Sequence, residues 1–143
     1  EVVTAMAAVA NGGKLIPPEV VQKVIKGSAN SMTVIEKMEP KIIRQDFIDS
    51  ENLQIVREGM RQAVTGFNSP LASAIMLNSL PVTSAAKTGT AELGNDRYHN
   101  WVSVFAPYED PQIVLTIIIE DIKGVHSAAV PVAREVLEWY FTP

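Results

Sequence analysis

Residues 82–121 read VTSAAKTGTAELGNDRYHNWVSVFAPYEDPQIVLTIIIED, and this stretch decides the fold. Three extended segments are expected within it, at 82–92, 99–106 and 112–121, because each is rich in small, β-branched or aromatic residues. The residues 107–111 that join the last two have the composition and length of a hairpin connection. An antiparallel meander of three strands is therefore predicted.

The third segment carries an unbroken apolar run at 113–119. Such a run, without polar alternation, is typical of a strand that is buried on both faces. Helices are therefore expected on both sides of the sheet.

Two helices are expected before the sheet. Residues 1–10 are rich in alanine and apolar on nearly every side, which predicts a buried helix that the Asn-Gly-Gly turn at 11–13 ends. Residues 50–64 show the helical spacing of apolar side chains, with Asp49 or Ser50 as the cap and Gly66 as the terminator. The predicted buried stripe of this second helix is Leu53, Val56, Met60, Ala63 and Phe67.

A closing helix is expected at 127–141, with Pro131 in its first turn. Its predicted inward-facing residues are Val132, Val136, Trp139 and Tyr140.

The remaining segments contain many turn-forming residues. Residues 14–49 predict irregular structure with one or two short strands, for example at 20–21 and 41–43, and a turn at 27–31. Residues 68–81 predict a loop with a short helical turn near 71–77. The order helix, irregular region, helix, three strands and helix is that of an α+β chain.

Composition narrows the classes of function. The net charge of −4 and the scattered basic residues argue against nucleic acid as a partner. The absence of cysteine excludes disulfides and thiolate metal sites. The longest apolar run is far shorter than the ~20 residues of a membrane-spanning helix. Because the first helix begins without a capping residue, we expect the chain to be a fragment, with any membrane anchor outside it.

The segment with candidate chemistry is Lys87-Thr88-Gly89-Thr90. Alternate side chains of a strand share a face, so Thr88 and Thr90 are predicted to point the same way. Gly89 lets the backbone lie close to a ligand. An ammonium beside two hydroxyls and exposed N–H groups is a suitable receptor for a peptide or its carboxylate.

Two other interpretations apply to this segment. A phosphate-binding loop requires glycine directly before the lysine and again five residues earlier, where this chain has Ala86 and Pro81, so that interpretation fails. An ordinary strand edge with a solvated lysine stays an equal alternative on spacing alone, because a motif of four residues is weakly specific.

The wider pattern resembles the class B transpeptidases of the penicillin-binding proteins, and within them the elongation-type penicillin-binding protein 2. The string SAAKTGTAE is similar to the Lys-Thr-Gly motif of that family. Further matching segments keep the family's order along the whole chain: ANGG at 10–13, EGM at 58–60, HNW at 99–101, FAPY at 105–108 and PVAREVL at 131–137. Ala86 stands where the family commonly has a glycine.

The resemblance implies a role for each motif residue. Lys87 sets the electrostatics of the site, Thr88 and Thr90 bind the carboxylate of the ligand, and the Thr90 N–H is an oxyanion donor. Lys87 and Thr90 are thus the candidate catalytic residues, and Lys87, Thr88, Gly89 and Thr90 the candidate substrate-binding residues. No cofactor or metal is implied.

The same resemblance implies the fold and activity of the parent protein. The fold is the penicillin-recognising type, and residues 1–143 are its C-terminal part. The parent is a peptidoglycan D,D-transpeptidase that acts on a D-Ala-D-Ala stem peptide and is acylated by β-lactams. It works outside the cytoplasm with proteins of cell-wall elongation. A β-lactam sensor domain and a non-catalytic cell-wall scaffold are the alternatives.

The family also needs a nucleophile in Ser-x-x-Lys and a Ser-x-Asn motif. Ser84-Ala85-Ala86-Lys87 fits the first pattern, but on a strand Ser84 and Lys87 point to opposite faces. Residues 28–30 fit the second pattern, but they follow the Asn-Gly-Gly turn, whereas the family has this motif earlier in the chain. We therefore expect the nucleophile to lie upstream of Glu1 and the isolated chain to be inactive. A half-domain would also expose apolar surface, so we expect marginal stability or self-association.

Other residues with possible chemistry have simpler interpretations. Asp96 and His99 could suggest a metal, but two histidines and no cysteine form a poor ligand set. His99 is expected near the site and His126 on a surface loop. The acidic residues of the strands, Glu92, Glu120 and Asp121, are expected in solvent. The aromatic residues Trp101, Phe105, Trp139 and Tyr140 are expected in the core.

Overall fold

A computed structural model describes residues 1–28, 31–67, 69, 71–124 and 127–142. The types and order of the elements confirm the predicted α+β arrangement. They are α1 (Val2–Ala10), β1 (Lys23–Ser28), β2 (Ser31–Lys37), α2 (Ser50–Thr65), the 3-10 helix η1 (Ile75–Ser79), β3 (Ala85–Gly94), β4 (Arg97–Ala106), β5 (Ile113–Lys123) and α3 (Ala129–Phe141). None of the helices in the described ranges is long and apolar enough to span a membrane.

Strands β3, β4 and β5 form an antiparallel sheet in that order, which confirms the predicted meander. Thr88 of β3 pairs with Val102 of β4, and Val102 pairs with Ile117 of β5. The central strand β4 is the most buried, with no exposed surface on Val104 or Phe105.

The predicted burial of 113–119 on both faces is wrong for the described part of the chain. There β5 lies at the edge of the sheet, and its residues are half-buried or exposed, with Ile118 at 38%. An apolar run shows what a strand prefers, whereas its burial depends on the neighbours beside it.

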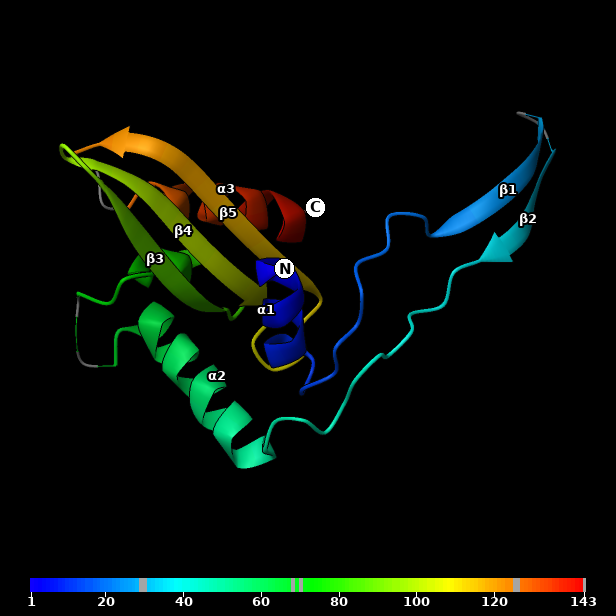
Figure 1. Cartoon of the computed structure of the whole chain (residues 1–143), viewed down its shortest axis with the longest axis horizontal. Coiled ribbons are helices and arrows are strands. Elements are labelled where there is room, and N and C mark those ends of the chain that lie inside the picture. Colours follow the sequence, from blue (N-terminus) through cyan, green and yellow to red (C-terminus); the bar gives the residue numbers. More distant parts are fainter. Residues whose placement is uncertain (29–30, 68, 70, 125–126, 143) are drawn as a thin grey trace.

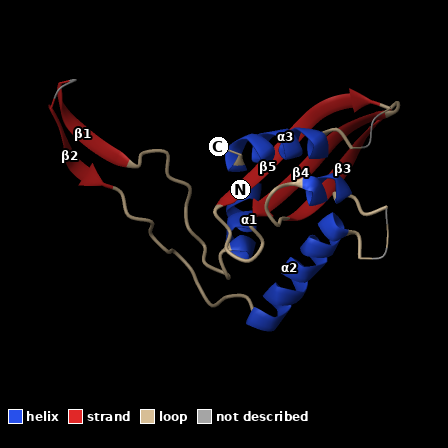
Figure 2. Cartoon of the chain, turned by 180° about the vertical axis from the view of Figure 1, so that it is seen from behind, coloured by secondary structure: helices blue, strands red, loops and turns tan. Residues whose placement is uncertain are grey.

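Helices cover both faces of the sheet, as predicted. Helix α3 lies across one face, which Figure 2 shows from behind. Its Ala133 and Leu137 share a core cluster with Val102 and Val104. Helix α1 packs on the opposite face, where its Ala10 belongs to a second cluster. The sheet is therefore the middle layer.

Helix α2 runs along β3 and links the two clusters (Figure 1). Met60 packs with Ala85 and Phe105 in one cluster, and Val64 joins the α3 side of the core. The first residues of β3 are consequently buried, whereas the residues from Lys87 onward are half-buried or exposed.

Helix α2 has the predicted ends but a different buried face. The Asp49 side chain accepts hydrogen bonds from the N–H groups of Glu51 and Asn52, and Gly66 ends the helix with φ of 83°. Of the predicted stripe, Leu53 and Met60 are buried, whereas two members are exposed, Val56 at 50% and Phe67 at 69%. Val64 is buried instead, so the real stripe follows 53, 57, 60 and 64 and passes through the charged residue 57.

The other two long helices are also less buried than predicted. In α1 only Ala8 and Ala10 are buried, because the side that carries Val2 and Val3 faces outward. Gly12 and Gly13 follow with φ of 82° and 93°, and they turn the chain away from the helix as expected.

In α3 the predicted inward face is wrong. Val132, Val136, Trp139 and Tyr140 are all exposed, Trp139 at 78%. The buried residues are Ala129, Val130, Ala133 and Leu137. Small residues let the helix approach the sheet closely, and this puts the larger aromatic side chains on the outer side.

Strands β1 and β2 form a separate hairpin, which stands away from the sheet on two extended connections (Figure 1). These strands are at 23–28 and 31–37, so the expected strands at 20–21 and 41–43 are wrong. Part of the predicted turn, residues 29–30, lies outside the described residues. The predicted helical turn near 71–77 is found slightly later, as η1, with Leu77 buried.

Candidate functional site

The motif Lys87-Thr88-Gly89-Thr90 lies in β3, where the strand becomes exposed. Thr88 and Thr90 pair with Val102 and Asn100, so both threonines belong to the face that carries α3. Lys87 and Gly89 belong to the opposite face. The predicted common direction of the two threonines is confirmed.

A hollow lies on each side of this strand. On the α3 side a cavity of about 200 Å³ is lined by Thr88, Thr90, Asn100 and the start of α3, together with Ser73 and Ser127. On the α1 side a hollow of about 280 Å³ is lined by Lys87, Trp101 and Ser103, together with Val2 and Met6. Hydroxyls therefore gather on one face of β3, and an ammonium with apolar side chains gathers on the other.

Lys87 is exposed, and its Nζ donates a hydrogen bond to the backbone carbonyl of Thr88. The ion pairs among the described residues all involve other cations. The ammonium is thus held beside the strand and available to an anionic ligand.

The packing of the sheet gives a second reason for glycine at position 89, in addition to the predicted approach of a ligand. A Cβ at this position would lie 3.3 Å from the Cβ of Trp101, its cross-strand neighbour. The lack of a side chain therefore lets Trp101 lie directly against the strand.

Ser84 has no access to a ligand. It directly precedes β3, is fully buried, and its hydroxyl has no partner among the described residues. Arg61 Nη1 donates to the Ser84 carbonyl at 2.8 Å. A nucleophile must reach an acyl carbon, and the fully buried Ser84 hydroxyl does not. The other candidate motif starts at Ser28, the last residue of β1, and its residues 29 and 30 lie outside the described residues.

The second motif with possible chemistry, Asp96-x-x-His99, does not bring its two side chains together. His99 Nδ1 accepts a hydrogen bond of 3.0 Å from the N–H of Asp121. Asp96 instead accepts from the hydroxyl of Tyr98. Burial, followed by this hydrogen bond, raises the pKa of Tyr98. Within the described ranges no group of three His, Asp or Glu side chains could hold a metal, and His126 lies outside them.

The acidic strand residues are exposed, as predicted. Asp121 forms an ion pair with Arg97, and the same contact raises the pKa of that guanidinium. Of the aromatic residues expected in the core, Phe105 is buried and Trp101 is half-buried beside the motif.

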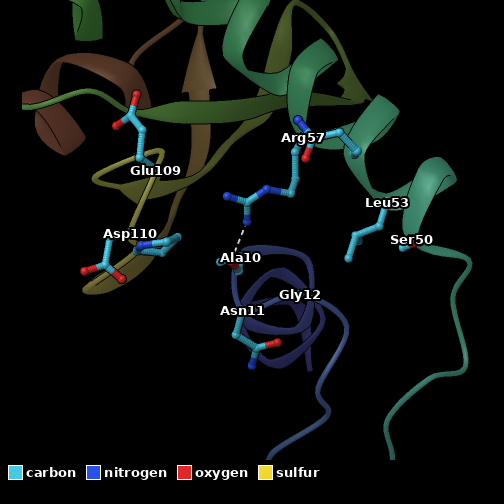
Figure 3. Close-up of a pocket in the computed structure, with 10 residues that line it drawn as sticks. Ala10, Asn11, Gly12, Ser50, Leu53, Arg57, Glu109 and Asp110 are labelled. Atoms are coloured by element: carbon cyan, nitrogen blue, oxygen red, sulfur yellow. Dashed lines mark hydrogen bonds between the residues drawn. The ribbon is translucent and has the colours of Figure 1, made fainter.

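Arg57 was not identified from the sequence. It reaches from α2 toward the end of α1 (Figure 3), where Nη1 donates to the carbonyls of Val9, at 3.1 Å, and Ala10. Its Nη2 donates to the Tyr108 carbonyl at 2.7 Å, and its guanidinium lies 4.9 Å from the centre of the Phe105 ring. The sequence feature that could have indicated its role is a charged residue at the helical spacing of the buried residues of α2.

The hollow beside Arg57 is the largest of those described, at about 600 Å³. Figure 3 shows that its walls come from the end of α1, the start of α2 and the β4–β5 connection. Since the guanidinium is directed at backbone carbonyls, Arg57 joins these three segments. We call the place where α1, α2 and the β4–β5 connection meet at Arg57 the structural junction, and we assign the hollow beside it a structural origin.

Asn100 is the second residue that sequence reasoning missed. It is 2% exposed, and its Oδ1 accepts a hydrogen bond of 2.7 Å from the N–H of Ala128, directly before α3. Asparagine is uncommon in the centre of a buried strand, and that was the available signal.

Comparison with known protein families gives a match over nearly the whole chain. Residues 1–138 match the family described as the penicillin binding protein transpeptidase domain. The chain is 26% identical to penicillin-binding protein 2A of Bacillus subtilis, over 99% of the chain and 21% of that protein. It is 28% identical to the peptidoglycan D,D-transpeptidase MrdA of Haemophilus influenzae, over 98% of the chain and 23% of that protein. The chain thus spans about a fifth to a quarter of the length of these curated relatives.

Solved structures show the same fold. Penicillin-binding protein 2B of Streptococcus pneumoniae superimposes with a TM-score of 0.82 at 22% identity, over 97% of this chain and 24% of that one. Penicillin-binding protein A of Mycobacterium tuberculosis, in an imipenem acyl-enzyme complex, gives a TM-score of 0.76 at 25% identity, over 98% of this chain and 30% of that one. The predicted fold class is confirmed.

Proposed function

Because this chain belongs to the penicillin-binding protein transpeptidase family, we propose that residues 1–143 are the C-terminal part of a serine D,D-transpeptidase domain that cross-links peptidoglycan. The nucleophilic serine comes from the part of the domain outside this chain. The buried Ser84 supports this division, because no ligand reaches its hydroxyl. The relatives support it too, since they are several times longer than the matched region.

The proposed reaction has two steps. The serine hydroxyl attacks the carbonyl carbon of the penultimate D-Ala of a stem peptide, and the peptide bond to the last D-Ala breaks. That D-Ala leaves as an amine with the proton from the serine. The amine of a neighbouring stem then attacks the acyl-enzyme, forms the cross-link and frees the serine. A β-lactam acylates the same serine by opening of its ring.

The residues of β3 bind the acyl donor in this proposal. Thr88 and Thr90 donate their hydroxyl protons to the terminal carboxylate of the peptide, and Lys87 supplies the positive charge that attracts it. The N–H of Thr90 donates to the oxyanion that forms on the attacked carbonyl, a kind of contact worth about 10²–10³ in rate. Gly89 keeps the strand narrow between them.

One observation carries this assignment: β3 is buried at Ala85 and Ala86 and becomes accessible over the motif, with the two threonines of the motif on one face. A solvated strand edge, the alternative interpretation, would not require two hydroxyls around a shared cavity. We further propose that the protein acts outside the cytoplasm, together with proteins of cell-wall elongation. A β-lactam sensor or a non-catalytic scaffold remains the second candidate function.

The test uses the whole protein that contains this chain, with a fluorescent penicillin and a stem pentapeptide as ligands. We expect Thr90→Val and Lys87→Ala to slow acylation at least about tenfold. The controls are Thr33→Val and Lys41→Ala, which change the same residue types at exposed positions near the hairpin. Equal acylation rates in all four variants would refute the assignment of the site.

Release of D-Ala from the pentapeptide distinguishes the candidate functions. A transpeptidase releases D-Ala and transfers the acyl group to an added amine. A sensor is acylated by penicillin without processing the pentapeptide, and a scaffold does neither. Intact mass of the isolated chain after incubation with penicillin gives a further check, since acylation of the isolated chain would place the nucleophile within residues 1–143.

A further inference from the structure

Asn100 is a buried polar residue of β4 that lies opposite the proposed ligand site. It pairs directly with Thr90 across β3 and β4, so the side chains of these two residues are neighbours on the α3 face. Both line the same cavity of about 200 Å³, with Thr88 beside them.

The two ends of the Asn100 amide have different partners. Its Oδ1 accepts from the N–H of Ala128 at 2.7 Å, and this contact attaches the start of α3 to the centre of the sheet. Helix α3 has no side-chain cap of its own, and Asn100 accepts from the N–H of its N-cap residue, the group that the N3 side chain satisfies in a capping box. The orientation of the amide is thereby set, with Nδ2 as its remaining donor.

Nδ2 has no hydrogen-bond partner among the described residues, although the atom is buried. A buried amide donor without an acceptor is unfavourable, so such groups normally have a partner in the working state. The other polar side chains around this cavity are mainly hydroxyls, each of which can accept one hydrogen bond while it donates another.

We propose that Asn100 is a positioning residue for the carboxylate of the acyl donor. When the carboxylate binds, Nδ2 forms a hydrogen bond to the hydroxyl oxygen of Thr90 that is not present in this structure, and this directs the Thr90 hydroxyl proton toward the ligand carboxylate. Hydrogen bonds in such a chain strengthen one another, because each donor polarises the next. The inference rests on the proposed function of β3, and it adds a residue from outside the Lys-Thr-Gly-Thr motif.

The decisive substitution is Asn100→Asp in the whole protein. It keeps the shape of the side chain and the acceptor for Ala128, but it replaces the donor by an anion. That anion accepts the Thr90 proton and repels the carboxylate of the ligand. We expect the Kd for penicillin before acylation to rise at least about tenfold, and the acylation rate constant to change much less. Asn52→Asp, at an exposed site in the first turn of α2, is the control for the added charge.

A double-mutant cycle with Thr90→Val separates positioning from general damage to the fold. If Asn100 acts through Thr90, the two substitutions together raise the Kd less than the product of their separate effects. Asn100→Ser, which retains a small donor and acceptor, should recover part of the affinity. Should Asn100→Asp not fold, the same cycle is measured with Asn100→Ser.

The outcomes keep this inference distinct from the function it rests on. Multiplicative effects in the cycle, or an Asn100→Asp variant that binds penicillin as the Asn52→Asp variant does, would overturn the inference while Thr90→Val still weakens binding. Unchanged binding in Thr90→Val itself would instead overturn the proposed function of β3.

Discussion

Replacing Arg57 with alanine should lower the free energy of unfolding by about 2–4 kcal/mol. Arg57 donates to backbone carbonyls in two separate segments, the end of α1 and the β4–β5 connection. These carbonyls lose a charged donor in the variant, because no other described side chain donates to them. The structural junction of α1, α2 and the β4–β5 connection would therefore loosen.

The expected loss of stability follows from three hydrogen bonds of Arg57 and its contact with an aromatic ring. A hydrogen bond from a charged donor contributes about 1.5–3 kcal/mol when it is well shielded. Arg57 is only half-buried and lies beside an open hollow, so water replaces part of what is lost. The contact with the Phe105 ring adds about 0.5–1 kcal/mol. The expected loss in the free energy of unfolding is therefore well below that of three fully shielded hydrogen bonds.

The assay is equilibrium unfolding in urea, with tryptophan fluorescence as the signal. Arg57→Lys should recover only part of the loss, because an ammonium cannot donate in the fixed fork of a guanidinium. Arg97→Ala is the matched control, since it removes an arginine from an exposed ion pair with Asp121. A loss for Arg57→Ala no larger than that for Arg97→Ala would refute the reasoning.

Three further predictions concern stability. Leu137→Ala should lower the free energy of unfolding in urea by about 2–5 kcal/mol, because Leu137 is fully buried. Trp139→Gln should lower it much less, because Trp139 is 78% exposed. Equal losses would contradict the observed buried face of α3. Gly66→Ala should lower the melting temperature, because φ is 83° and the new Cβ would lie 2.5 Å from a backbone oxygen; an unchanged melting temperature would contradict this. The hydrogen bond from Thr83 lowers the pKa of Glu109 from its ordinary value of 4.5, so it stabilises the protein above that pH and is lost as the pH falls through the lowered pKa. Thr83→Val should thus lose more stability at neutral pH than in acid, and the difference that remains in acid reflects the lost hydrogen bond from the Tyr108 N–H to the Thr83 hydroxyl. A loss of stability that was the same at both pH values would contradict the assignment.

Much of the architecture was predictable because it follows from local chemistry. Asp49 and Gly66 mark the ends of α2 through capping and the left-handed conformation, both of which depend on a few adjacent residues. The alternation of a strand likewise placed Thr88 and Thr90 on one face before any neighbour was known. Element types, their order and the Lys-Thr-Gly-Thr motif were therefore available from the sequence by itself.

Burial depended on the tertiary structure, because it is decided by what packs from distant parts of the chain. Trp139 is apolar and has helical spacing, yet the sheet packs against Ala133 and Leu137 instead. Arg57 occupies a position in the buried stripe of α2 only because the carbonyls at the end of α1 and in the β4–β5 connection lie within its reach.

The same distinction applies to the site. The presence of two hydroxyls and an ammonium on one strand could be predicted from the sequence, because composition and alternation are local. Only the tertiary structure brought Asn100 opposite Thr90 and the start of α3 onto Asn100, since strand register and helix docking join residues that are far apart in the chain. The buried surroundings of Ser84 were decided in the same way, by packing against residues that its own segment does not contain.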